Sequence, residues 1–157
     1  MTEKTARCLV LACGNPLRSD DGVGLRLGDW AAKRFQADSN VRVLSSQQWT
    51  PDLAHEIASA DAVLFVDSSI ESAAGRINLD PVPIESETSA STTHHMDPPA
   101  LLALAHSLYA ARPAHAMLLT VGAGSMELGE TLTGPVQAAM PRAQRVLEKT
   151  VLRFLGN

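Results

Sequence analysis

Continuous apolar runs alternate along the chain with segments whose apolar residues recur every three or four positions. The first run covers residues 8–13, and a polar turn that contains glycine follows it over residues 14–22. Beyond the turn, apolar side chains return at the spacing of one helix face: Val23, Leu27, Trp30, Ala31 and Phe35. A strand, a glycine-containing loop and a helix in this order form the opening unit of an α/β domain.

The same alternation continues towards the C-terminus. Further strands are predicted over residues 41–44, 62–66, 76–80 and 115–121, and further helices from residue 50, from residue 97 and over residues 136–154. Because the run 62–66 is apolar without interruption, it suits a strand covered on both faces. Prolines after residue 80 suit a sheet edge, and residues 86–93, which have no apolar period, predict a loop.

These elements predict one α/β domain that spans residues 1–157. Because strands and helices alternate, we expect a three-layer sandwich with helices on both faces of a mostly parallel, twisted sheet of about five strands. The length of 157 residues and the hydrophobic content of 45% allow a sizeable core.

Charge and hydropathy narrow the classes of partner. The net charge is −4 and no basic patch stands out, which argues against nucleic acid as a partner. The first residues lack the basic-then-apolar order of a signal peptide, and no apolar run approaches the ~20 residues that span a bilayer. We therefore expect a cytoplasmic protein without a membrane partner.

Cys8 and Cys13 stand at the two ends of one predicted strand. They are roughly 16 Å apart, which is too far for a disulfide.

Two adjacent carboxylates, Asp20 and Asp21, stand where the first helix should start. In one interpretation, Ser19 or Asp20 caps the helix and the next acid complements the helix dipole. In the other, the loop lies at the carboxyl edge of the parallel sheet, where open α/β folds bind ligands. Two carboxylates would repel a phosphate and attract a metal or another cation. The residues alone leave both interpretations open.

Asp67 and the histidine pair at positions 94 and 95 also have one chemical and one structural interpretation. Asp67 comes directly after the apolar run 62–66, so it lies beside the first loop if the two strands are neighbours. Its structural alternative is to cap the following turn. His94 and His95 precede the helix that starts near Asp97, and neutral imidazole is a common ligand of borderline metals. The alternative is a pair of exposed histidines without a chemical role.

The first loop also carries a family motif. It reads Gly14-Asn15-Pro16-Leu17-Arg18-Ser19-Asp20-Asp21-Gly22-Val23-Gly24. This run resembles the G-N-x-L-x-x-D-[DE]-G-x-G element of the hydrogenase maturation proteases, endopeptidases that trim the C-terminus of the large subunit of nickel-iron hydrogenases. Residues 125–136 resemble the family's S-x-E-[LP]-G-x-x-L-[ST]-P-x-V stretch, with one extra glycine before the proline.

The resemblance implies an endopeptidase that removes a C-terminal tail from the nickel-loaded large-subunit precursor. It implies that Asp21 and Asp67 are catalytic and that Asp21, Asp67 and His94 bind a metal. The implied metal is nickel supplied by the substrate, which other divalent metals should replace in vitro. In many relatives the second loop engages the substrate. We therefore expect Gln48 and Thr50 to contact it here, together with His95, which is also a possible substitute for His94 as ligand.

Other classes of function remain as alternatives. A non-proteolytic, metal-binding accessory protein of hydrogenase maturation would also bind metal, but only a protease would shorten the large subunit. Because the sequence has neither H-E-x-x-H nor G-x-S-x-G, it supports neither zincin nor serine-hydrolase chemistry. A nucleotide-binding domain is disfavoured because G-x-G-x-x-G and G-x-x-x-x-G-K-[ST] are both absent.

Overall fold

The computed structural model describes residues 6–83 and 96–156. Along the chain its elements are β1 (Ala6–Cys13), the short 3-10 helix η1 (Ser19–Gly22), α1 (Val23–Arg34), β2 (Val41–Ser46), α2 (Leu53–Ala58), β3 (Ala60–Ser69), β4 (Ile77–Pro81), α3 (Pro98–Tyr109), β5 (His115–Gly122) and α4 (Gly134–Phe154). The loop predicted over residues 86–93 lies outside the described residues, as do His94 and His95.

The strands form one five-stranded sheet in the order β2-β1-β3-β5-β4. All neighbours are parallel except β4, which runs antiparallel to β5 at one edge and ends at Pro81. A proline is tolerated there because an edge strand needs no further ladder hydrogen bond. The mostly parallel sheet of about five strands and the edge position of residues 76–80 are thereby confirmed.

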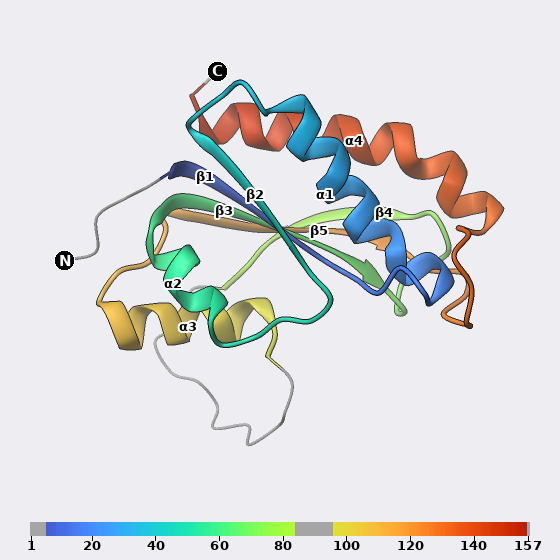
Figure 1. Cartoon of the computed structure of the whole chain (residues 1–157), viewed down its shortest axis with the longest axis horizontal. Coiled ribbons are helices and arrows are strands. Elements are labelled where there is room, and N and C mark those ends of the chain that lie inside the picture. The colour runs from blue at the N-terminus through green and yellow to red at the C-terminus, as the bar shows by residue number, and fades with distance from the viewer. Residues whose placement is uncertain (1–5, 84–95, 157) are drawn as a thin grey trace.

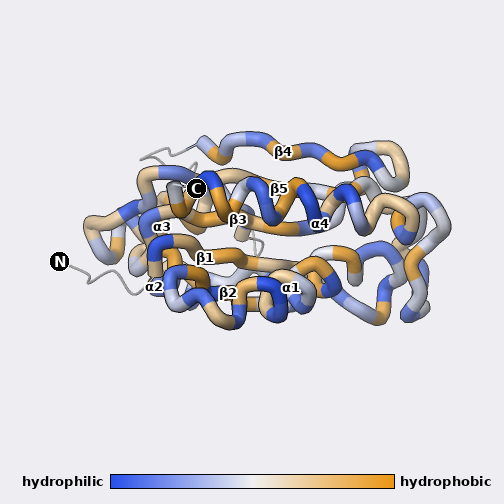
Figure 2. The backbone as a smooth tube through the Cα atoms, turned by 90° about the horizontal axis from the view of Figure 1, so that it is seen from above, coloured by the Kyte–Doolittle hydropathy of each residue, from blue (hydrophilic) through white to orange (hydrophobic). Residues whose placement is uncertain are grey.

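Helices cover both faces of the sheet, so the three-layer arrangement is confirmed. In Figure 1, α1 and α4 lie above the strands, and α2 and α3 lie below them. Alternate residues of the central strands supply two separate cores: Val10 and Val66 pack with the α1/α4 layer, whereas Leu11 and Phe65 pack with the α2/α3 layer. This two-sided burial explains why β1 and β3 are apolar along most of their length (Figure 2).

The third strand is longer than its apolar run. The sequence predicts a strand over residues 62–66 that ends before Asp67, but β3 continues to Ser69. Its pairing with β5 persists to the last pair, Ser69 with Gly122, and this ladder keeps the polar residues extended. Asp67 is therefore a strand residue, and it does not begin a turn.

Two predicted helix starts have different outcomes. Asp97 caps α3 as predicted, since its Oδ1 accepts a 2.9 Å hydrogen bond from the Ala100 amide. The start predicted at Thr50 is wrong, because α2 begins at Leu53 and no side chain caps it. Thr50 instead accepts a 3.0 Å hydrogen bond from the Leu53 amide through its backbone carbonyl.

None of the helices in the described part of the chain is both long and apolar enough to cross a membrane.

Candidate active site

Asp21 and Asp67 lie at the carboxyl edge of neighbouring parallel strands. β1 pairs with β3 up to Ala12 and Val66, so the loop after β1 leaves the sheet beside Asp67. The structure brings both carboxylates into one cavity of about 430 Å³. The rest of its lining comes from the first loop, the loop after β2 and the start of α3: Cys13, Gly14, Asn15, Arg18, Gln47, Gln48, Trp49 and Met96.

The carboxylate of Asp21 is held by two hydrogen bonds. The Asn15 amide donates to its Oδ2 at 2.9 Å, and the Ser68 hydroxyl donates to its Oδ1 at 2.7 Å. Close packing of the loop backbone also requires Gly14, because a Cβ at that position would collide with the Asp21 carbonyl oxygen. Asp21 therefore presents a fixed, hydrogen-bonded carboxylate to the cavity.

Asp67 has a different electrostatic environment. Burial raises its pKa to about 6, against the opposing hydrogen bonds of the Ser68 amide and the Trp49 side chain, and the nearby charge of Asp21 raises it further. The Ser68 amide lies 2.8 Å from Oδ1 of Asp67. A carboxyl group with this pKa exchanges a proton near neutral pH, which a general acid or base needs.

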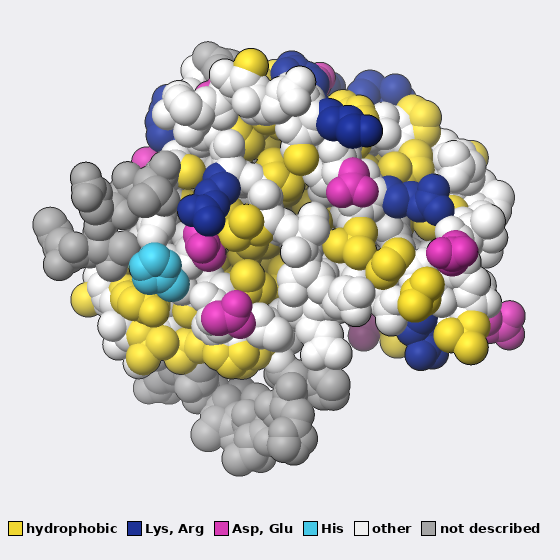
Figure 3. All heavy atoms as spheres, in the orientation of Figure 1, with side chains coloured by type: hydrophobic (Ala, Val, Ile, Leu, Met, Phe, Trp, Pro, Cys, Tyr) yellow, Lys and Arg dark blue, Asp and Glu magenta, His cyan; other side chains and the backbone are white. Residues whose placement is uncertain are grey.

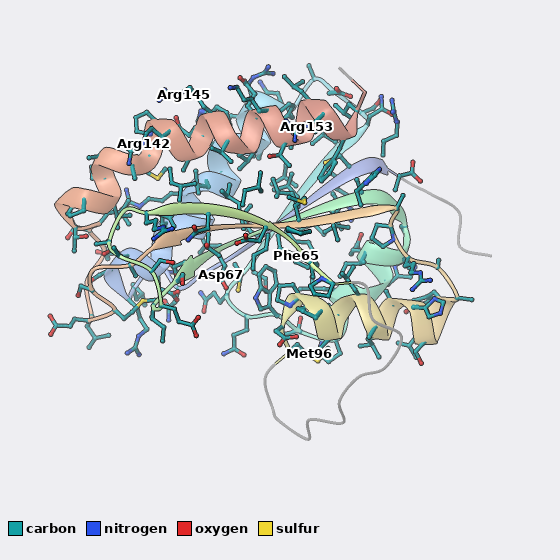
Figure 4. All side chains as sticks on the ribbon, turned by 180° about the vertical axis from the view of Figure 1, so that it is seen from behind. Phe65, Asp67, Met96, Arg142, Arg145 and Arg153 are labelled. Atoms are coloured by element: carbon teal, nitrogen blue, oxygen red, sulfur yellow. The ribbon has the colours of Figure 1, made fainter. Side chains whose placement is uncertain are left out.

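An apolar wall borders the two acids. Trp49 meets Phe65 edge to face with 5.5 Å between ring centroids, and Met96 lines the cavity from the α3 side. In Figure 4, Phe65 and Asp67 lie along β3 above Met96, while Arg142, Arg145 and Arg153 lie on α4 in the opposite layer. Arg18, and none of these three arginines, is among the lining residues of the cavity.

The neighbouring acid, Asp20, is structural. Its carboxylate is fully buried and accepts four hydrogen bonds: from the Gly124 and Ser125 amides at 2.7 and 3.0 Å, and from the amide and hydroxyl of Thr133 at 2.7 Å each. Burial acts to raise the pKa of Asp20, but these hydrogen bonds outweigh it and hold the pKa below its ordinary value. Asp20 thus fastens the first loop to the loop after β5.

Helix capping does not explain the paired acids. No side chain caps either η1 or α1, so the capping interpretation of Ser19 and Asp20 is wrong. Three backbone amides and the Thr133 hydroxyl, all distant in sequence, provide Asp20 with more partners than a helix end could offer. Ser19 adopts the left-handed backbone region at φ 51°, which turns the chain between Arg18 and Asp20.

The structure places only part of the predicted substrate-contact set in the cavity. Gln48 lines it, whereas Thr50 is not among its lining residues. His95, like the predicted ligand His94, lies outside the described residues. Met96, the next residue in the sequence, lines the cavity.

Several side chains that line or contact the cavity were not predicted from the sequence. Ser68 and Arg18 carried no signal of their own, but Trp49 did, as a lone aromatic in a polar stretch after the second strand. Cys13 lines the cavity as a buried free thiol. Burial, followed by the charges of Asp67 and Asp21, raises the pKa of Cys13 to about 12, so it remains a thiol at neutral pH.

The two carboxylates by themselves are too few ligands to hold a metal ion. Oxygen donors suit a divalent cation, and a borderline metal would also accept imidazole or thiolate. Within residues 6–83 and 96–156, no group of three or more His, Cys, Asp or Glu side chains could hold a metal ion. Asp21 and Asp67 would need a further ligand, from outside these residues or from a partner, to hold one.

Comparison with known proteins defines the class of this fold. No family model matches the sequence, and no curated protein matches it. Among solved structures, the chain is similar to the hydrogenase maturating endopeptidase HybD from E. coli, with 24% identity over 94% of this chain and 93% of that one and a TM-score of 0.69. It is also similar to a hydrogenase 2 maturation peptidase from a Thaumarchaeota archaeon, with 25% identity over 92% and 97% of the chains and a TM-score of 0.70.

A third structure extends the same similarity. The [NiFe] hydrogenase maturation protease HycI from Thermococcus kodakarensis KOD1 is 21% identical over 97% of this chain and 94% of that one, with a TM-score of 0.70. The chain therefore has the fold of the hydrogenase maturation endopeptidases. The fold that the family resemblance implies is thereby confirmed.

Proposed function

We propose that this protein is an endopeptidase that removes a C-terminal tail from the nickel-loaded large-subunit precursor of a nickel-iron hydrogenase. The observation that carries the proposal is the pairing of Asp21 and Asp67 in one cavity at the carboxyl edge of the sheet. The fold supports it, because similar solved structures are named as hydrogenase maturation endopeptidases.

In this proposal the metal arrives with the substrate. Asp21 and Asp67 provide oxygen ligands to the precursor's nickel, and His94 provides an imidazole. Bound nickel would polarise the scissile carbonyl group. Asp21, fixed by Asn15 and Ser68, keeps one carboxylate in a constant position, so that docking of the nickel also positions the peptide bond.

Asp67 supplies the proton transfer. As a water oxygen bonds to the carbonyl carbon, the Asp67 carboxylate accepts a proton from that water. It then returns the proton to the leaving nitrogen as the carbon–nitrogen bond breaks. Before the substrate binds, burial raises the pKa of Asp67 to about 6, so this carboxyl group takes up and releases protons more readily near neutral pH than an exposed aspartate. Gln48, on the cavity wall, offers an amide donor and acceptor to the backbone of the tail.

Co-expression with a nickel-containing large-subunit precursor tests the proposal, with the product weighed by mass spectrometry. The wild type should release a C-terminal tail, and Asp21→Asn and Asp67→Asn should leave the precursor at full mass. Asp29→Asn is the matched control, since Asp29 is an exposed aspartate on α1 outside the cavity, and it should process normally. If the wild type binds nickel but leaves the precursor intact, the accessory-protein alternative replaces the protease.

A further inference from the structure

One side of the β2 backbone has no strand beside it. β2 lies at an edge of the sheet, next to β1. In a parallel ladder, alternate residues direct both their N–H and C=O groups to the same neighbour. The Gly14 amide donates to the Ser46 carbonyl at 3.1 Å, so the even-numbered residues of β2 face β1. The backbone groups of Val43 and Ser45 therefore point out of the sheet, and they have no hydrogen-bond partner within residues 6–83 and 96–156.

This outer edge of β2 is open to solvent. None of the six residues of the strand is buried. In Figure 1 β2 crosses the front of the sheet, and in Figure 2, seen from above, it lies on the same side of the molecule. Figure 3, in the orientation of Figure 1, shows apolar and uncharged groups over the middle of this face, between charged side chains. An exposed row of unpaired N–H and C=O groups can pair with another extended chain.

The outer edge of β2 lacks the features that usually protect a sheet edge, which are prolines and unpaired charges. β4, at the opposite edge, ends with Asp80 and Pro81, and the residues found to line the acidic cavity include none from β4. β2 contains no proline, and its one charged residue, Arg42, is paired with Glu56 at 3.0 Å. Of the two edges, β2 is therefore the one suited to pairing.

β2 also leads directly into the acidic cavity. The next residues along the chain, Gln47, Gln48 and Trp49, line the cavity. The Ser46 hydroxyl donates a 2.7 Å hydrogen bond to the Gln48 carbonyl, which holds this turn. At about 3.3 Å per residue, Ser45 lies within roughly 7–13 Å of the three lining residues. A peptide paired with the outer edge of β2 would therefore continue into the cavity.

We propose that the C-terminal tail of the large-subunit precursor binds as an added strand on the outer edge of β2, antiparallel to it. This inference rests on the proposed function, which brings the tail to the cavity. The tail begins at the cavity, where β2 ends, and extends towards the start of β2, so its direction is antiparallel. Two tail residues would pair with Ser45 and Val43 through N–H···O=C bonds, and the residue between them would face away. Such main-chain bonds hold a peptide in the extended form.

A second copy of this chain is a less suitable occupant of the edge. The Val41 amide already donates to the Asp38 carbonyl at 3.1 Å, so only Val43 and Ser45 offer a free N–H and C=O pair. A stable interface between proteins buries about 1,200–2,000 Å², which pairing over so short an edge does not supply. The tail would gain further contacts in the cavity.

Ser45→Pro tests the added strand. It removes the outward amide nearest the cavity and no ladder bond to β1, so the variant should fold, with a thermal midpoint close to that of the wild type. Because a hydrogen bond to the tail is lost and the proline ring obstructs pairing, kcat/KM for the nickel-loaded precursor should fall about tenfold or more. Ile77→Pro is the matched control at the outer side of β4, where the Arg76 carbonyl on the inner side accepts from the Gly122 amide. It should process the precursor like the wild type.

Proline substitutions in the precursor provide a second test that does not depend on the folding of Ser45→Pro. Proline is placed at successive positions of the tail beyond the cleaved bond, and KM is measured with the wild-type protein. An added strand predicts two sensitive positions, each with KM raised about tenfold, separated by one tolerant position, because only alternate tail amides face β2. Equal effects at all positions, or at none, would overturn the proposal.

The results separate this proposal from the protease proposal. If the wild type shortens the precursor and folded Ser45→Pro keeps the wild-type kcat/KM, the tail does not pair with β2. If the wild type binds the precursor without shortening it, and Ser45→Pro binds about tenfold more weakly, the added strand stands and the protease proposal fails. In ultracentrifugation, a wild-type dimer that Ser45→Pro loses would assign the edge to contacts between copies and overturn the proposal.

Discussion

The hydroxyl of Ser68 donates a 2.7 Å hydrogen bond to Oδ1 of Asp21, a residue 47 positions earlier in the chain. Ser68 is also the neighbour of Asp67 on β3, and its amide bonds to the Asp67 carboxylate. One residue therefore contacts both acids of the cavity and links the loop after β1 to the end of β3. The relative position of the two carboxylates depends on this contact.

Removing the Ser68 hydroxyl should impair processing more than folding. Because a hydrogen bond to a charged group contributes roughly 1.5–3 kcal/mol, Ser68→Ala should lower kcat/KM for the precursor about tenfold or more. Ser68→Thr, which keeps a hydroxyl, should restore most of the activity. Ser107→Ala, at an exposed serine on α3, is the matched control and should have no effect. Wild-type kinetics in Ser68→Ala would mean that the contact does not position Asp21.

Asp20→Asn should destabilise the fold. The amide group that replaces one carboxylate oxygen would turn its hydrogens towards buried amides that donate to Asp20 in the native protein. The unsatisfied donors should lower the free energy of unfolding by roughly 2–3 kcal/mol in a urea titration. The exposed control Asp29→Asn should change it by less than about 0.5 kcal/mol. Equal stability of the two variants would contradict the structural role of Asp20.

Asp67 should make the protein less stable as the pH rises. Its pKa of about 6 in the folded protein exceeds the ordinary aspartate value of roughly 4, so the folded chain binds this proton more tightly. The resulting stability is fully present below about pH 4 and is lost as the pH rises through about 6. Asp67→Asn should thus be roughly 1–2 kcal/mol more stable than wild type at about pH 7.5, with no gain near pH 4. A variant that is less stable at both pH values would show that the ionised group does not destabilise the folded protein.

Local sequence patterns predicted the elements because two-sided burial requires continuous apolar strands, as in β1 and β3. The same patterns could not predict where β3 ends, because its polar residues Asp67 and Ser68 stay extended through pairing with β5. They also indicated helix capping as a possible role for Asp20. In the folded protein its carboxylate instead accepts hydrogen bonds from the backbone amides of residues 124, 125 and 133. Asp67 could be placed beside Asp21 only if their two strands, β1 and β3, were neighbours in the sheet. The sequence patterns did not determine the order of the strands.

The two histidines before α3 should differ in importance. The family spacing to the Leu-rich helix fits His94, so His94→Ala should abolish processing of the precursor and His95→Ala should retain most of it. Mass spectrometry of the co-expressed precursor measures both variants, and each serves as the control for the other. The reverse result would assign the ligand role to His95.

The most direct test of the central claim compares nickel-filled and nickel-free forms of the same purified precursor. Asp21 and Asp67 alone form no complete catalytic group, so substrate nickel should be required before any peptide bond is positioned. We predict that the wild-type protein releases the C-terminal tail from the nickel-filled precursor, measured as a loss of mass over time, and leaves the nickel-free form intact. Cleavage of the nickel-free precursor at a comparable rate would contradict the account, and so would an Asp67→Ala variant that cleaves the nickel-filled form as fast as wild type.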